Sequence, residues 1–136
     1  MINYRTVNGS FDLSGKTAIV IGGGGGIGGT TAEMYAGKGA NIAVVDCKDN
    51  VEDAAIELAA KYGVKTIGLR CDVTIQTEVE NIVSKVVDTF GEINILANMP
   101  GYVELERASS IDIDVIERHI AINAVGVFRI CQAVAN

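Results

Sequence analysis

Short apolar runs alternate with longer segments in which side chains recur at helical spacing. The apolar runs predict strands at residues 17–21, 41–45, 65–69 and 93–97. The longer segments predict helices over 26–38, 51–62 and 74–90, and a last helix from about residue 112 to the end of the sequence. Polar residues 1–14 indicate a surface arm, and residues 98–110 a loop. This alternation predicts an α/β fold with parallel strands and helices on both faces.

Capping residues and glycines mark the ends of the predicted helices. Asn50 and Thr74 stand where an N-cap side chain is expected, and glycines follow the predicted helices. Side chains at helical spacing predict the packed faces of two helices. These are Ile27, Thr31, Met34 and Tyr35 in the first, and Val79, Ile82, Val83, Val86 and Val87 in the third.

Length, charge and cysteine usage limit the functions that the chain can have. A chain of 136 residues suits one domain, residues 1–136. A net charge of −6 argues against a nucleic-acid partner, and no apolar run reaches the roughly 18 residues of a membrane span. Cys47, Cys71 and Cys131 lack metal-ligand spacing, so we expect no metal site and a reduced, cytoplasmic protein.

Five consecutive glycines follow the first apolar run. Glycine adopts positive φ without strain and lets backbone N–H groups approach a ligand, and a strand, a glycine turn and a helix in succession form a phosphate cradle. The glycines fit the general dinucleotide pattern Gly23-x-Gly25-x-x-Gly28 and also the pattern Gly22-x-x-x-Gly26-x-Gly28. No Lys-Ser/Thr follows them, which excludes a Walker-type loop. A merely flexible turn is the remaining alternative.

Polar residues also stand at the ends of the other predicted strands. Asp46 follows the second strand about 20 positions after the glycine run, where a carboxylate can accept both hydroxyls of an adenosine ribose. Such a carboxylate repels a 2′-phosphate, which favours NAD over NADP. Asp72 and Val73 end the third strand, where a short side chain and free backbone groups can bracket an adenine edge. Asn98 and Gly101 follow the fourth strand, again at the sheet edge where open α/β sheets bind ligands.

Taken in order, these residues resemble the short-chain dehydrogenase/reductase family from Phe11 onward. The matching elements are Gly22-x-x-x-Gly26-Ile27-Gly28, Asp46, Asp72-Val73-Thr74, Asn98-x-x-Gly101 and Asn123. The opening segment is slightly similar to members that act on sugar alcohols. The resemblance implies a Rossmann-type doubly wound parallel sheet, with strand order 3-2-1-4 and NAD as cofactor.

The resemblance also implies a cofactor site built from every strand end: Gly22, Gly26, Ile27, Gly28, Asp46, Cys47, Asp72, Val73, Asn98 and Gly101. In such a site the glycine turn would hold the pyrophosphate and Asp46 the adenine ribose. Asp72 and Val73 would flank the adenine. Asn123 would be the catalytic asparagine, which holds a water in a proton relay.

The sequence departs from the family pattern at three points. Ile21 replaces the usual Thr before the glycines, and Pro100 stands between Asn98 and Gly101. The family's chemistry also needs a Ser and a Tyr-x-x-x-Lys, but no tyrosine in the sequence has a Lys four positions later. We therefore expect a truncated domain of about four strands that lacks the catalytic half and is inactive alone.

Truncation would leave apolar surface uncovered. Without a fifth strand, residues 93–97 would form an open apolar edge, so homo-oligomerisation through that edge or through the last helix is expected. The preferred function is the NAD-binding part of an oxidoreductase acting on an alcohol or carbonyl substrate. The alternatives are a non-catalytic nucleotide-binding or interaction module, and a nicotinamide enzyme of another class.

Overall fold

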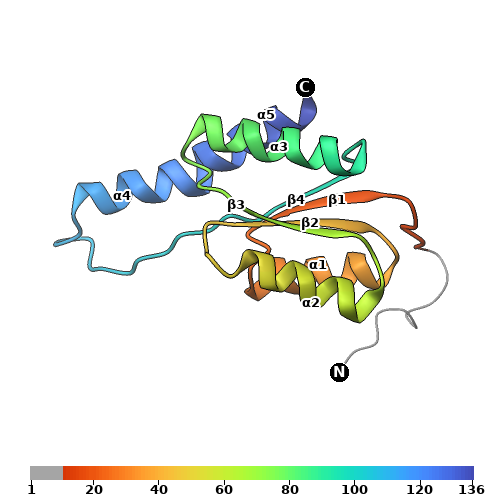
Figure 1. The fold of residues 1–136 in the computed structure, drawn as a ribbon. Coiled ribbons are helices and arrows are strands. Elements are labelled where there is room, and N and C mark those ends of the chain that lie inside the picture. The colour runs from red at the N-terminus through yellow and green to blue at the C-terminus, as the bar shows by residue number, and fades with distance from the viewer. Residues whose placement is uncertain (1–10) are drawn as a thin grey trace.

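The computed structural model describes residues 11–136, so most of the expected surface arm lies outside the described residues. Strands and helices alternate along the chain (Figure 1). The strands are β1 (Thr17–Ile21), β2 (Asn41–Asp46), β3 (Thr66–Arg70) and β4 (Ile95–Asn98). The helices are α1 (Gly26–Gly37), α2 (Val51–Tyr62), α3 (Gln76–Phe90), α4 (Ile113–Ile120), the π-helical η2 (Ala121–Gly126) and α5 (Val127–Ala135).

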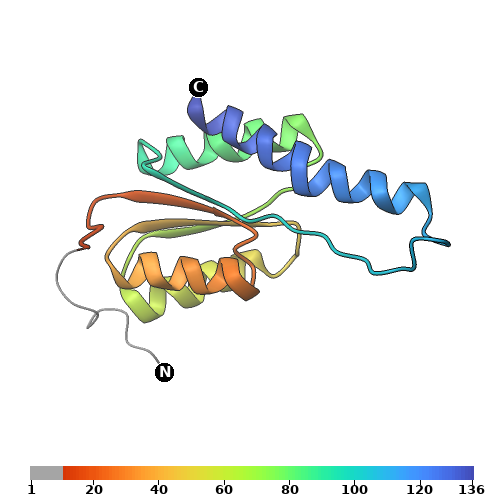
Figure 2. The ribbon, with the colours of Figure 1, turned by 180° about the vertical axis from the view of Figure 1, so that it is seen from behind.

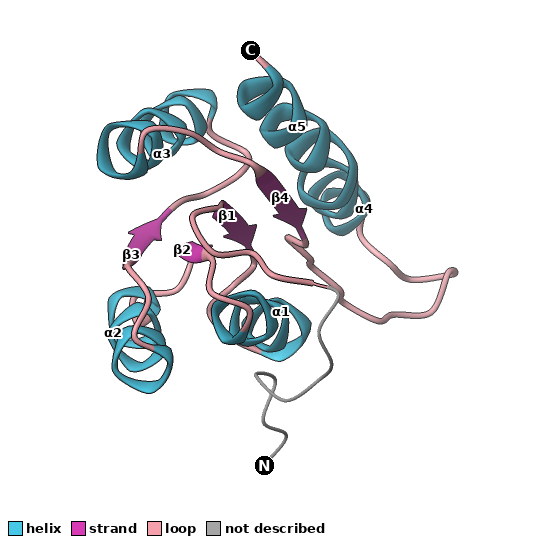
Figure 3. Cartoon of the chain, turned by 90° about the vertical axis from the view of Figure 1, so that its right-hand side faces the viewer, coloured by secondary structure: helices cyan, strands magenta, loops and turns pink. Residues whose placement is uncertain are grey.

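Within residues 11–136 the strands form one parallel sheet in the order β3-β2-β1-β4. Helices α1 and α2 cover one face of the sheet, and α3 and α5 cover the other (Figure 3). The strand order and the two helical layers confirm the Rossmann-type α/β fold predicted from the sequence.

Alternate residues of β1 contribute to two separate cores. Ala18 and Val20 pack on the side of α1 and α2, whereas Ile19 and Ile21 pack on the side of α3 and α5. All four side chains are buried. Because both faces are covered, the strands read as continuous apolar runs rather than as alternating polar and apolar residues.

The buried face of α1 differs from the predicted one. Its buried residues are small, namely Gly28, Ala32, Ala36 and Gly37. Ile27 is 80% exposed and Met34 is 47% exposed, while Thr31 and Tyr35 are half-buried. The prediction was wrong for Ile27 and Met34, whereas Tyr35 does pack against the core on this side of the sheet. Small residues allow the closest approach of a helix to the sheet, and hydrophobicity alone does not reveal them.

Neither predicted capping side chain caps its helix. Asn50 precedes α2 but makes no capping hydrogen bond, and α3 begins at Gln76 rather than at Thr74. The Thr74 N–H and hydroxyl instead donate to Asp72 Oδ1 over 2.8 and 2.7 Å. Further along α3, Val87 is 41% exposed, whereas three residues of the predicted face are buried: Val79, Ile82 and Val86.

The last helix is divided into α4, η2 and α5, where the sequence predicts one continuous helix. Helix α4 and the loop before it project past the carboxyl ends of the strands (Figures 1 and 2). Strand β4 forms one edge of the sheet, and its residues are half-buried. Among the described helices, none combines the length and the apolar character needed to cross a membrane.

Candidate functional site

The carboxyl ends of the strands surround one cavity of about 510 Å³. Nine of the residues predicted to bind a cofactor line it: Gly22, Gly26, Ile27, Gly28, Asp46, Cys47, Asp72, Val73 and Gly101. They come from four separate segments of the chain, which the parallel sheet brings to the same edge. The fold therefore gathers most of the predicted residues around a single space.

The glycine turn is packed tightly, and backbone atoms leave no room for a side chain at Gly22 and Gly28. Gly22 has φ +77°, and a Cβ there would lie 2.9 Å from the carbonyl carbon of Met99. A Cβ on Gly28 would lie 2.6 Å from the carbonyl carbon of Gly22. Both positions need glycine because backbone atoms occupy the place of the side chain. The turn thus has a defined, tightly packed conformation, which argues against a merely flexible link.

The N-terminus of α1 begins at this turn. Its N-cap, Gly25, has no side chain to satisfy the first N–H groups, and no acidic residue lies in the first turn of the helix. Unpaired N–H groups and the positive end of the helix dipole attract anions. This end of the cavity can therefore bind a phosphate group.

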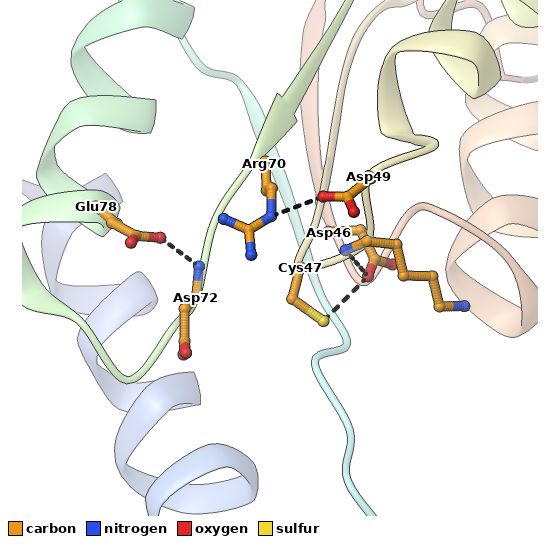
Figure 4. Close-up of polar contacts among 7 residues, drawn as sticks. Asp46, Cys47, Asp49, Arg70, Asp72 and Glu78 are labelled. Carbon is orange, nitrogen blue, oxygen red and sulfur yellow. Dashed lines mark hydrogen bonds and ion pairs between the residues drawn. The ribbon is translucent and has the colours of Figure 1, made fainter.

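Asp46 closes the next side of the cavity, at the end of β2. Its Oδ2 accepts a hydrogen bond from the Gly24 N–H over 2.9 Å, and its Oδ1 accepts one from the Lys48 N–H over 3.3 Å. Figure 4 shows the ends of β2 and β3, with Asp46 and Cys47 on one and Asp72 on the other. The Asp46 side chain is half-buried, so part of it remains accessible from the cavity. Its carboxylate oxygens can therefore accept hydrogen bonds from the hydroxyl groups of a ligand.

Several hydrogen bonds hold the turn after β3. Besides its bonds with Thr74, Asp72 donates its N–H to Glu78 Oε2 over 2.7 Å (Figure 4). The hydrogen bonds from Thr74 lower the pKa of the Asp72 carboxyl below its ordinary value of 3.8. Next to it, burial and then the charges of Glu78 and Asp72 raise the pKa of the Cys71 thiol to about 12. Asp72 is therefore an anion and Cys71 a neutral thiol near pH 7.

Cys47 is exposed at the mouth of the cavity. Partial burial raises the pKa of its thiol, and the neighbouring Asp46 carboxylate adds to the effect. Cys47 Sγ lies 3.6 Å from Asp46 Oδ1. The thiol is therefore less acidic than a free cysteine, which suits a contact residue better than a nucleophile.

The loop after β4 forms the opposite wall and is fixed to the last helix. Asn123 Oδ1 accepts the Tyr102 N–H, and Asn123 Nδ2 donates to the Tyr102 carbonyl, both over 2.8 Å. His119 Nε2 accepts the Glu104 N–H over 3.1 Å, and its ring stands edge-on to Tyr102 with centroids 4.9 Å apart. The predicted catalytic residue Asn123 does not line the cavity, but it holds a residue that does.

Asn98 also lies outside the cavity lining. It ends β4 opposite Ile21, as its position in the sequence predicts. Its side chain, however, turns toward α5, where Nδ2 donates to the Val127 carbonyl over 2.8 Å. Its Oδ1 is buried without a hydrogen-bond partner among the described residues.

The lining also includes residues that were not assigned to the site from the sequence, among them Met99, Tyr102 and Ile122. Met99 and Tyr102 lie in the loop at the carboxyl end of β4. Their position next to Asn98 and Gly101 in the sequence could have indicated that they line the cavity. Ile122 belongs to η2, and no pattern in the sequence shows that this turn reaches the cavity. These residues add apolar surface to the wall of the cavity.

A second hollow of about 630 Å³ lies between α1 and α2. Its lining includes Glu33, Asp53, Glu57 and Lys61, and Lys61 Nζ pairs with Glu33 Oε1 over 2.7 Å. With its one lysine already paired, this acidic groove disfavours an anionic ligand.

The cavity at the strand ends is therefore the better candidate for the functional site. It combines N–H donors, a carboxylate and apolar walls, and these suit phosphate, hydroxyl and ring groups of one ligand.

A family model described as short chain dehydrogenase matches residues 16–136. The chain belongs to this family. The short chain dehydrogenase model therefore covers all the strands and helices described above, and the resemblance inferred from the motifs is confirmed.

Relatives of known name agree with this assignment. The chain is 38% identical over 130 residues to a D-threitol dehydrogenase of Mycolicibacterium smegmatis, covering 95% of this chain and 50% of the relative. It is 28% identical over 133 residues to an NAD-dependent glycerol dehydrogenase of Listeria innocua, covering 98% of this chain and 51% of the relative. The expected likeness to members that act on sugar alcohols is thus confirmed.

A solved structure of a short-chain type dehydrogenase/reductase from Mycobacterium marinum superimposes with a TM-score of 0.87 and 34% identity. The match covers 92% of this chain and 49% of the solved chain. The chain spans about half the length of the curated relatives that it matches.

Proposed function

We propose that this chain is the NAD-binding portion of a short-chain oxidoreductase. The whole protein would transfer hydride between the nicotinamide ring and an alcohol or carbonyl substrate. The observation that carries the proposal is the single cavity in which the glycine turn, Asp46 and Asp72 meet. When bound, NAD supplies the hydride acceptor, and the residues of the chain bind and orient it.

Each side of the cavity would take one part of the dinucleotide. The turn at Gly22, Gly26 and Gly28, with the exposed Ile27, would hold the pyrophosphate. Asp46, with Cys47 beside it, would bind the adenine ribose, and Asp72 and Val73 would flank the adenine. At the nicotinamide end, Gly101 would lie along the cofactor, while Asn98 and Asn123 would act by fixing the surrounding backbone.

Asp46 supports NAD rather than NADP. Its carboxylate stands at the end of β2, where a 2′-phosphate would meet a negative charge. Lys48 is the nearest cation in the sequence, and it contributes its backbone N–H to Asp46. An NAD-dependent glycerol dehydrogenase among the relatives agrees with this preference.

The relatives that act on threitol and glycerol support a hydroxylated substrate such as a small polyol. The catalytic step would need residues beyond those that we identify in this chain, because no Tyr-x-x-x-Lys occurs in its 136 residues. We expect the 136-residue chain to be inactive alone. The absence of a Tyr-x-x-x-Lys motif also supports the second candidate function, a non-catalytic nucleotide-binding module.

Self-association is part of the proposal. Several large apolar side chains are exposed along the last helix: Ile113, Ile116, Ile120, Val125 and Phe128. Exposed apolar patches of this kind are typical of interaction surfaces. We also expect a cytoplasmic protein, since its three cysteines are unpaired.

Titration of the chain with NAD, by calorimetry, tests the assignment. Asp46→Ala should weaken NAD binding at least about tenfold, because a hydrogen bond to a charged group contributes ~1.5–3 kcal/mol. Asp88→Ala removes a carboxylate from the exposed surface of α3, away from the cavity, and should leave NAD binding unchanged. Equal affinities for wild type and Asp46→Ala would remove Asp46 from the site. Turnover of NAD with glycerol or threitol at ordinary rates would contradict the expected inactivity.

A further inference from the structure

Helix α5 contacts the turn after β3 through one charged side chain. Arg129 Nη1 donates to the Val73 carbonyl over 2.6 Å, and Arg129 Nε donates to Gln76 Oε1 over 3.0 Å. Val73 lines the cavity, and Gln76 is the first residue of α3. A single guanidinium thus ties the last helix to the cavity wall and to the start of the neighbouring helix.

The backbone of the last helix also contacts the side chain of Val73. A Cβ on Gly126 would lie 2.6 Å from Val73 Cγ2. Val73 is buried between this glycine and the α3 side of the sheet. Gly126 and Arg129, one turn apart, therefore hold Val73 by its side chain and by its carbonyl group.

The hydrogen bond from Arg129 is stronger than a neutral one because its donor is charged. The positive charge also helps to lower the pKa of the neighbouring Asp72 carboxyl, after the larger effects of the Thr74 hydrogen bonds and of the Arg70 charge. Asp72 and Thr74 close the turn from within, and Glu78 holds it from α3. Arg129 adds a charged side-chain contact from outside the β3–α3 unit.

We propose that Arg129 is the positioning residue for the adenine end of the bound dinucleotide, because it fixes the backbone of Val73 against the cavity. The inference rests on the proposed function, in which Asp72 and Val73 flank the adenine. Arg129 itself does not line the cavity, so it acts through Val73 and touches neither the cofactor nor the reacting atoms.

A pair of ligand fragments separates positioning from general stability. ADP-ribose contains the adenine, and nicotinamide mononucleotide does not. In Arg129→Met, which keeps the length of the side chain but removes its donors, affinity for ADP-ribose should fall about tenfold while affinity for nicotinamide mononucleotide stays unchanged. Arg129→Lys keeps one charged donor and should restore part of the loss. Lys85→Met removes an exposed charge from α3 and serves as the matched control.

Hydrogen exchange of the free protein gives a second measurement. The amides of Thr74 and Ile75 should exchange faster in Arg129→Met than in wild type, because the turn loses its tie to α5. If Arg129→Met does not fold, Gln76→Leu removes one of the two acceptors and should weaken ADP-ribose binding by a smaller factor.

The outcomes distinguish the inference from the function on which it rests. If wild type binds neither NAD nor ADP-ribose, the proposed function fails and the inference fails with it. If wild type binds ADP-ribose and a folded Arg129→Met binds it equally well, only the inference is overturned. Equal losses for both fragments would also overturn it, since they would indicate a structural role without positioning.

Discussion

Gly28 packs against the carbonyl group of Gly22, so closely that a Cβ on Gly28 would lie 2.6 Å from the Gly22 carbonyl carbon. The first turn of α1 is therefore seated on the strand-to-helix turn by backbone contact alone. The spacing of the glycine pattern follows from this contact, because one residue of the helix must lie over the first glycine of the turn.

Substitution of Gly28 should be costly and substitution of Gly29 should not. Gly28→Ala forces the turn and helix apart, and overpacking of this kind costs ~1–3 kcal/mol of unfolding free energy. At Gly29 a Cβ would lie 3.5 Å from the Gly23 carbonyl oxygen, an ordinary contact. Gly29→Ala should therefore be neutral or stabilise by about 0.5–1 kcal/mol, the usual gain inside a helix. Urea denaturation of both variants checks the pair, and equal stabilities would contradict the packing described.

The stability of the turn after β3 should depend on pH through Asp72. Its pKa is lowered in the folded state by the bonds from Thr74, so the stabilisation is present above the unfolded pKa of about 4. The stabilisation is lost as the pH falls through the folded pKa. Comparison of wild type with Asp72→Asn should show a difference in unfolding free energy at pH 6 that shrinks below pH ~4. Asp88→Asn, at an exposed position on α3, is the control, and a difference that grows in acid would contradict this reasoning.

The paired hydrogen bonds between Asn123 and Tyr102 should protect the loop after β4. Asn123→Ala removes both bonds and should lower the unfolding free energy by about 1–2 kcal/mol. Asn123→Asp keeps the acceptor for the Tyr102 N–H and loses only the donor. Hydrogen exchange should therefore show an unprotected Tyr102 amide in the Ala variant and a protected one in the Asp variant. A protected amide in both would mean that another group holds the loop.

The exposed apolar side chains of the last helix should control self-association. Phe128 is 68% exposed on α5, and Phe128→Glu should shift the protein toward monomer in analytical ultracentrifugation. Phe11 is similarly exposed at 73% but lies before β1, so Phe11→Glu should leave the oligomeric state unchanged. Wild-type protein that is already monomeric at high concentration would rule out this interface.

The two cysteines of the cavity should react differently with thiol reagents. In a Cys131→Ser background, Cys47 is exposed and should be labelled at pH 8, although more slowly than a free thiol because its pKa is raised. Cys71 is buried with a pKa raised to about 12 and should stay unlabelled. Saturating NAD should slow the labelling of Cys47. Labelling of Cys71 at the rate of Cys47 would contradict the burial described.

The strands and most of the cavity could be predicted because they depend on strong local signals, whereas the strand order was implied by the resemblance to the family. Continuous apolar runs identify buried parallel strands, and residues that follow such strands meet at one edge of the sheet. Asp46, Asp72 and Gly22 were therefore assigned to one site without knowledge of any contact. The sequence correctly placed Asn98 at the carboxyl end of β4. The direction of its side chain could not be predicted, because it depends on a hydrogen bond to the Val127 carbonyl, 29 residues later in the sequence.

The features that were missed depend on tertiary contacts. Thr74 has the chemistry of an N-cap, but Asp72 accepts both of its donors. The packed face of α1 is selected by closeness to the sheet, which favours Gly28 and Ala32 over the larger Ile27. The sequence pattern does not mark the division of the last helix, which lies where Asn123 bonds to Tyr102 of the loop after β4.

The π-helical segment η2 sets how α5 is rotated about the helix axis relative to α4. A π-helical turn holds more residues than an α-helical turn, and each residue of an α-helix corresponds to a rotation of about 100°. One residue deleted between Ala121 and Gly126 would convert this turn into an α-helical one and leave Ile130 facing the core. One residue deleted between Val127 and Arg129, where the helix is regular, would instead rotate Ile130 out of the core. The π-helical turn is therefore the part of the last helix where a deletion of one residue should do the least harm.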